Sequence, residues 1–69
     1  MEYSKRDFKN WKAYEQVRRS GQFNMITDCV QASKASKLSM ETYKKMVLHY
    51  GAIEQAIIRE YGSVENYLG

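Results

Sequence analysis

The chain has 69 residues and a formal net charge of +3 at neutral pH, which leaves room for one small domain and suits a nucleic acid or an acidic protein as partner. Cys29 is the only cysteine, so an intrachain disulfide is excluded and a reducing cytosol is the simplest compartment. No segment resembles a secretion signal or approaches the roughly 18 consecutive apolar residues of a membrane helix. We therefore expect no membrane partner.

Proline is absent and most of the glycines lie where a helix should end, which is typical of an all-helical protein. The first helix is predicted over residues 5–20. Ser4 is placed to cap it, Asp7 stands in the capping-box position, and Gly21 follows as a left-handed C-cap. Its predicted buried face consists of Phe8, Trp11, Tyr14 and Val17.

The second helix is predicted over residues 25–36, after a sharp turn. Asn24 is placed to cap this helix, and Phe23 is expected to enter the corner between the two helices. The side that we expect to be buried consists of Met25, Ile26, Cys29, Val30 and Ala32.

A longer helix is predicted over residues 40–61, with Ser39 as its N-cap and Gly62 at its end. Its apolar stripe passes through Gly51 without losing phase, which favours one continuous helix although a glycine inside a helix costs about 1 kcal/mol relative to alanine. Ser63 then caps a short final turn. The sequence thus predicts an all-α fold in a single domain over residues 1–69, a compact three-helix bundle with a short C-terminal helical turn.

Four cations share one narrow stripe of the helix over residues 5–20. They are Lys5, Lys9, Lys12 and Arg19. Such a basic ridge could follow phosphates or an acidic protein surface, with Trp11 or Tyr14 as an aromatic neighbour that contacts the partner. The alternative is that these cations only solvate the outer face of a helix whose other face is buried.

The segment over residues 37–46 has the layout of a helix-turn-helix unit that reads DNA, with apolar Leu38 in the turn. The residues that would contact DNA are Ser39, Thr42, Lys44 and Lys45. Two features depart from this pattern: Lys37 stands where a glycine is usual, and Glu41 is acidic where a phosphate would lie. The same geometry also occurs in plain helical bundles.

The chain has many aromatic residues for its length, so we expect some of the tyrosines to lie at the surface and to contact another protein. A symmetric homodimer through the helix over residues 40–61 is one such arrangement, although Glu54 interrupts the seam. The seam would consist of Tyr43, Val47, Tyr50, Ile57 and Tyr61.

No motif points to catalysis, a cofactor or a metal. His49 is the only histidine, and one histidine with one cysteine cannot build the usual structural zinc site. A glycine-rich phosphate loop is also missing from the sequence. We therefore expect a protein that is not an enzyme and that has no catalytic residues and no cofactor.

The segment VRRSGQFNM, followed by CVQA, combines an arginine, a Ser-Gly pair, an Asn-Met pair and a later Val-Gln pair. In this it resembles a family of small phage and prophage proteins of Gram-positive bacteria with no assigned activity. The matching residues are Arg18, Ser20, Gly21, Asn24, Met25, Val30 and Gln31. The resemblance implies an origin in a mobile element, whose small proteins often bind and block a host component, and hence the cytoplasm of a bacterial host.

These observations predict a non-enzymatic binding protein. The first hypothesis is that it engages, and inhibits, a host enzyme or an anti-phage defence component through the basic, aromatic-flanked helix. The alternative is a DNA-binding regulator that uses residues 37–46.

Overall fold

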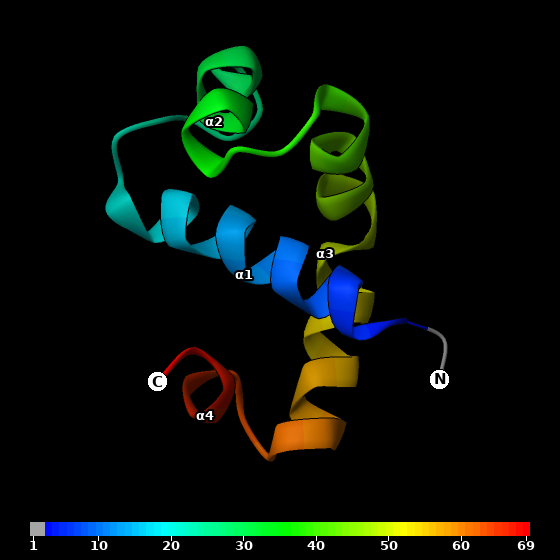
Figure 1. Cartoon of the computed structure of the whole chain (residues 1–69). Coiled ribbons are helices and arrows are strands. Elements are labelled where there is room, and N and C mark those ends of the chain that lie inside the picture. Colours follow the sequence, from blue (N-terminus) through cyan, green and yellow to red (C-terminus); the bar gives the residue numbers. More distant parts are fainter. Residues whose placement is uncertain (1–2) are drawn as a thin grey trace.

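The structure, a computed structural model, describes residues 3–69, and its regular elements over that range are all helices. They are α1 (Lys5–Ser20), α2 (Cys29–Ser36), α3 (Met40–Tyr61) and α4 (Val64–Leu68). In Figure 1, α1 crosses the long α3, α2 packs at one end of this pair, and α4 folds back from the other end of α3. The predicted all-α fold with three main helices and a short C-terminal helix is confirmed.

Both ends of α1 form as predicted. The Ser4 hydroxyl accepts a hydrogen bond from the backbone N–H of Asp7 at 3.2 Å, and the Asp7 carboxylate accepts one from the backbone N–H of Ser4 at 3.0 Å. Gly21 ends the helix with φ of 71°, a left-handed conformation that side chains with a Cβ rarely adopt. The bounds of α1 are therefore set by its own sequence.

α2 begins at Cys29, four residues later than predicted. Asn24 instead caps a separate helical turn, in which its side-chain oxygen accepts hydrogen bonds from the N–H groups of Ile26 and Thr27 at 2.9 and 3.0 Å. Asp28 closes that turn, because its carboxylate accepts the N–H of Asn24 at 3.0 Å and its φ and ψ of −101° and 31° leave the helical region.

This break changes which side of α2 is buried. Ala32, Ser33 and Ser36 face the interior, whereas Ile26 and Val30, both predicted to be buried, are 69% and 49% exposed. The small inward residues allow α2 to contact α1 and α3 closely. The prediction of the second helix is thus right in type and in the burial of Met25 and Ala32, and wrong in its start and in the burial of Ile26 and Val30.

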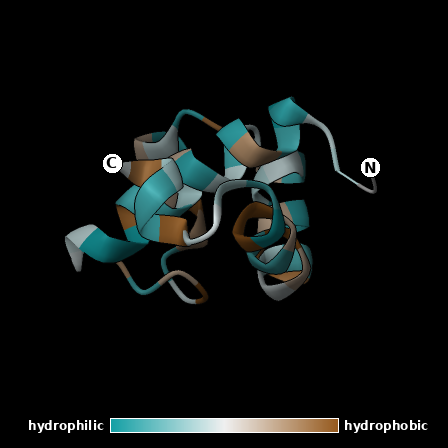
Figure 2. Cartoon of the chain, turned by 90° about the horizontal axis from the view of Figure 1, so that it is seen from below, coloured by the Kyte–Doolittle hydropathy of each residue, from teal (hydrophilic) through white to brown (hydrophobic). Residues whose placement is uncertain are grey.

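α3 is a single helix through Gly51, as the phase of its apolar stripe predicted. Ser39 caps it by accepting the N–H of Thr42 at 3.2 Å, and Gly62, with φ of 87°, ends it. Ser63 then caps α4 by accepting the N–H of Asn66 at 3.0 Å. Hydrophobic and hydrophilic residues alternate along the long helices, as amphipathic helices require (Figure 2).

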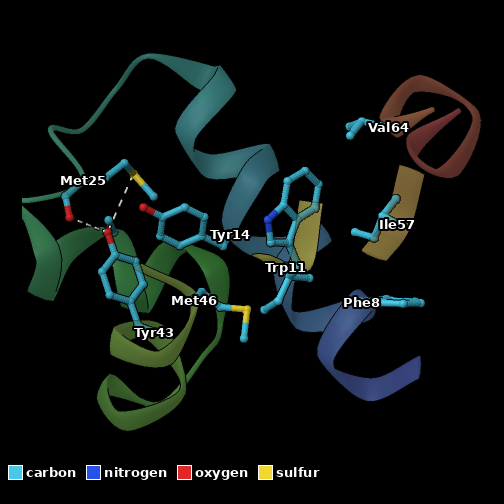
Figure 3. Packing of buried hydrophobic residues seen from close by; sticks show 10 residues of the cluster. Phe8, Trp11, Tyr14, Met25, Tyr43, Met46, Ile57 and Val64 are labelled. Carbon is cyan, nitrogen blue, oxygen red and sulfur yellow. Dashed lines mark hydrogen bonds between the residues drawn. The ribbon is translucent and has the colours of Figure 1, made fainter. Parts of the chain in front are cut away.

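The core is rich in aromatic side chains from α1 and α3. Figure 3 shows Trp11 and Met46 in its middle, the Tyr43 and Met25 pair on one side of them, and Phe8 and Ile57 on the other. The Tyr43 hydroxyl donates a hydrogen bond to the Met25 carbonyl at 2.8 Å, and the Trp11 indole N–H donates one to the Tyr50 carbonyl at 3.2 Å. The polar atoms of these rings are satisfied inside the chain.

The burial of these rings changes two predictions. Trp11 and Tyr14 are 0% and 4% exposed, so neither can flank the basic ridge as a contact for a partner. The predicted dimer seam is likewise wrong, because Tyr43 and Ile57 are buried and Tyr50 packs against Trp11 within the same chain.

Candidate functional site

A polar cleft of about 440 Å³ lies where α1 passes the junction of α2 and α3. The term polar cleft is used below for this surface. Its lining consists of Arg6, Asp7, Asn10, Lys37, Leu38, Ser39, Thr42 and Lys45. It brings together residues from α1 and residues from the predicted helix-turn-helix unit. The cleft therefore unites part of the two basic segments that the sequence predicted separately.

The turn at the cleft is shaped by the end of α2. Lys37 adopts φ of 62°, and the N–H groups of Lys37 and Leu38 donate hydrogen bonds to the carbonyls of Lys34 and Ser33 at 3.1 and 3.2 Å. This is the hydrogen-bond pattern of a Schellman motif, in which glycine usually occupies the left-handed position. A lysine here costs conformational energy, and its side chain lines the cleft.

The N-terminus of α3 forms one end of the cleft. The Ser39 hydroxyl accepts the N–H of Thr42 and donates a hydrogen bond to the Thr42 hydroxyl at 3.0 Å, so both hydroxyls are held in place. The helix dipole adds partial positive charge at this end, which favours an anion.

Among residues 3–69, one carboxylate lines the cleft. The Lys45 ammonium lies 2.9 Å from Asp7, and the hydrogen bond from Lys45 holds the pKa of Asp7 below its ordinary value, although burial acts in the opposite direction. No carboxylate among residues 3–69 lies within ion-pair distance of Arg6 or Lys37. Two of the three cleft cations are therefore available to an anionic ligand.

An apolar groove of about 270 Å³ lies on the other flank of α3. The term apolar groove is used below for this surface. Its apolar lining consists of Met25, Ile26, Cys29, Tyr43, Val47 and Leu48. Leu48, at its edge, is 81% exposed. Lys44 also lines this groove, so of the four residues predicted to contact DNA, Ser39, Thr42 and Lys45 share the cleft and Lys44 does not.

The basic ridge on α1 is divided. Lys5 and Lys9 are exposed, but the Lys12 ammonium lies 5.7 Å from the centre of the Tyr67 ring of α4. The Arg19 guanidinium lies 2.8 Å from Glu15 and 3.6 Å from Glu65. Within the part of the chain that the structure describes, only Lys5 and Lys9 of the predicted ridge face solvent without such a contact.

Sequence reasoning missed the role of Glu15, which is 1% exposed. Its carboxylate accepts hydrogen bonds from Arg18 at 2.6 and 2.9 Å, from Arg19 at 2.8 Å and from the Tyr50 hydroxyl at 2.8 Å. Burial acts to raise the pKa of Glu15, but these hydrogen bonds outweigh it and lower the pKa to about 2. The arginines three and four residues later were the only local signal.

The described residues hold little that suggests chemistry. No three His, Cys, Asp or Glu side chains of residues 3–69 are grouped so that they could hold a metal ion. His49 Nδ1 lies 3.1 Å from the Tyr3 hydroxyl, and Cys29 is half-buried in the apolar groove. Within the same residues, none of the helices combines the length and apolarity needed to cross a bilayer.

Comparisons of the chain with protein-family models, with curated proteins and with solved structures gave no significant match.

Proposed function

We propose that the protein is a non-enzymatic nucleic-acid-binding protein that contacts duplex DNA through the polar cleft and the α2–α3 unit. The observation that carries this proposal is the polar cleft, where Arg6 and Lys37 lie free of acidic partners, among residues 3–69, beside the N-terminus of α3. Arginine, lysine, amide and hydroxyl side chains at a helix N-terminus are the groups that contact phosphate oxygens in protein–DNA complexes.

The geometry of the α2–α3 unit supports the same proposal. A helix of eight residues is followed by a turn over residues 37–39 and then by α3, and the turn adopts a left-handed conformation at Lys37. In helix-turn-helix proteins the N-terminal residues of the second helix approach the bases. Here that position holds Ser39 and Thr42, both at the edge of the cleft.

A second candidate function is contact with an acidic surface of a host protein. Lys5 and Lys9 favour it, because both are exposed on the first half of α1 and have no ion-pair partner among residues 3–69. In either case the protein would act in the cytoplasm of a bacterial host, as the resemblance to phage and prophage proteins suggests. The first candidate uses Arg6 and the turn, whereas the second uses Lys5 and Lys9.

Fluorescence anisotropy with a labelled DNA duplex, measured over a range of salt concentrations, tests the first candidate. The variant carrying Arg6→Ala and Lys37→Gly loses two cations, and the glycine suits the left-handed backbone at position 37. We expect its affinity to fall roughly tenfold. The plot of log affinity against log salt should become shallower, with the absolute value of its slope smaller by roughly 2.

Lys44→Ala is the control for Arg6→Ala alone, because each removes one cation but Lys44 lies on the opposite flank of α3. We expect it to leave the salt slope nearly unchanged. Equal losses in this control and in the cleft variants, or no affinity for duplex at low salt, would reject the cleft as a DNA site. Capture of a protein from nuclease-treated lysate that Lys5→Glu with Lys9→Glu abolishes would then favour the second candidate.

A further inference from the structure

The outward side of α3 carries a line of exposed residues that the DNA-binding proposal does not use. They are Glu41, Leu48, Ala52, Gln55 and Arg59. Steps of seven, four, three and four residues bring them onto one side of a helix. The buried residues Tyr43, Met46, Ile53 and Ile57 lie on the opposite side. We call this line the outer stripe of α3.

Glu41 and Arg59 carry the charges at the two ends of the outer stripe, and the exposed Lys45, which lies beside the stripe between Glu41 and Leu48, is paired with Asp7 of α1. Glu41 lies in the first turn of α3 and Arg59 in its last turn, while Leu48, Ala52 and Gln55 between them are uncharged. Neither Glu41 nor Arg59 takes part in an ion pair with another residue of 3–69. A stripe that is acidic at one end and basic at the other is complementary to a copy of itself in antiparallel orientation.

The spacing of the residues fits that orientation. Glu41 and Arg59 are equally far from Tyr50 in sequence, and so are Leu48 and Ala52. An antiparallel register that places Glu41 opposite Arg59 of the second copy therefore also places Leu48 opposite Ala52 of the second copy. Both chemical matches arise from one twofold axis, which is what an isologous dimer requires.

Surface shape agrees with this register. Leu48 is 81% exposed at the edge of the apolar groove, and a Cβ at Gly51 would meet no atom within 4 Å. Because Gly51 has no side chain and Ala52 has only a methyl group, the α3 helix of a second copy can approach closely at this point and cover the projecting Leu48. Ile26, 69% exposed on the far wall of the groove, extends the apolar area beside the stripe.

We propose that the protein forms a homodimer in which the α3 helices of two copies pack antiparallel along their outer stripes, with Glu41 of each copy facing Arg59 of the other. The contact is about 27 Å long, from the rise of about 1.5 Å per residue between the two charges. Such a single-helix contact is smaller than a standard interface of roughly 800 Å² per partner, so the dimer is weak and reversible. The proposal does not rest on DNA binding, because none of the outer-stripe residues lines the polar cleft, although Lys45 of the cleft lies beside the stripe.

Sedimentation velocity of the free protein over a wide range of concentrations tests the dimer without any nucleic acid. We expect the wild type to shift from monomer to dimer as its concentration rises. Leu48→Glu should raise the dissociation constant more than about tenfold, because it places a charge at the centre of the contact. Glu60→Arg is the matched control, since it reverses an exposed charge of α3 away from the stripe and should leave the dissociation constant unchanged.

Charge reversal at the two ends tests the orientation. Glu41→Arg alone and Arg59→Glu alone each bring like charges together and should weaken their homodimers roughly three- to tenfold. A mixture of these two variants restores opposite charges at both ends, so it should form a heterodimer at least as tight as the wild-type homodimer. Far-ultraviolet circular dichroism checks that each variant keeps its helices.

Three outcomes would overturn the proposal. They are a protein that remains monomeric at its highest soluble concentration, a dimer insensitive to Leu48→Glu, and single charge variants that gain nothing when mixed. The last outcome would indicate that another face forms the contact, whereas single charge variants that dimerise as tightly as the wild type would indicate a parallel arrangement of the same stripes. The salt dependence of DNA binding is measured in a separate experiment, so failure of the dimer proposal does not decide whether the proposed function is right.

Discussion

Asp7 and Glu15 are two carboxylates of α1 that each tie this helix to α3, but they do so in different surroundings. Glu15 is 1% exposed and reaches Tyr50 of α3 by a hydrogen bond of 2.8 Å, with two arginines of its own helix around it. Asp7 lies at the wall of the polar cleft and reaches Lys45 of α3, whose side chain is 47% exposed.

The difference shows how the same chemical group can be buried in the fold or lie at the surface that we propose for DNA binding. The hydrogen bonds around Glu15 saturate its oxygens and occupy Arg18 and Arg19, so these cations contribute to the fold rather than to a binding surface. Among residues 3–69, Asp7 neutralises one of the three cations that line the cleft, so the described lining carries a net positive charge. We therefore expect changes at Glu15 to affect folding and changes at Asp7 to affect ligand affinity.

The largest expected effect is that of Glu15→Ala. It removes a buried carboxylate with four hydrogen bonds and leaves the Tyr50 hydroxyl without its partner. Because the arginines are half-exposed and can turn to water, we expect a loss of about 3 kcal/mol in the free energy of unfolding, at the low end of the range for broken buried pairs.

Urea unfolding followed by circular dichroism measures this loss. A domain of this size has a total stability of only about 3 to 5 kcal/mol without a staple, so the variant should be close to unfolded at room temperature. Glu15→Gln keeps the shape and the bond to Tyr50 and should lose less. A loss below about 1 kcal/mol for Glu15→Ala would show that the cluster behaves as an ordinary surface ion pair.

The second-largest expected effect is the loss of stability in acid, to which Glu15 should contribute much more than Asp7. The pKa of Glu15 is about 2 in the folded chain and 4.5 in its reference state, so the stability it contributes is present above pH 4.5 and is lost as the pH falls toward 2. Integration predicts a loss of about 2 kcal/mol between neutral pH and pH 3 from this group. Unfolding free energies measured over that range should show it, and Glu15→Gln should flatten the curve much more than Asp7→Asn.

The caps were the features that the sequence predicted best. Ser4, Asp7, Gly21, Ser39 and Gly62 act through backbone groups within a few residues of themselves, so their roles can be read from local spacing. The continuity of α3 through Gly51 followed from the phase of apolar residues in the same way. These local signals were sufficient for the fold class and for most helix bounds.

The candidate surfaces depended on information that spacing does not contain. A helical wheel placed Lys12 and Arg19 in the basic ridge, but Tyr67 and Glu65, which contact them, arrive from α4 at the far end of the chain. The wheel also could not show that Asp28 would end a turn early and expose Ile26. Long-range packing decided which polar residues face one another, and that packing was not predictable from the sequence pattern.

Asp7→Asn should have the smallest effect on stability and an opposite effect on binding. An exposed ion pair contributes up to about 1 kcal/mol, and asparagine keeps an oxygen that can accept the N–H of Ser4, so we expect a loss near 0.5 kcal/mol. The substitution also frees Lys45 inside the cleft, which should raise the affinity for duplex DNA about threefold. The plot of log affinity against log salt should become steeper, with the absolute value of its slope larger by roughly 1. Glu60→Gln changes the net charge equally but lies outside the cleft, so an equal gain in that control would mean that DNA senses only the total charge of the protein. A gain confined to Asp7→Asn would instead place the phosphate contact beside Lys45, because only a local anion distinguishes these two carboxylates.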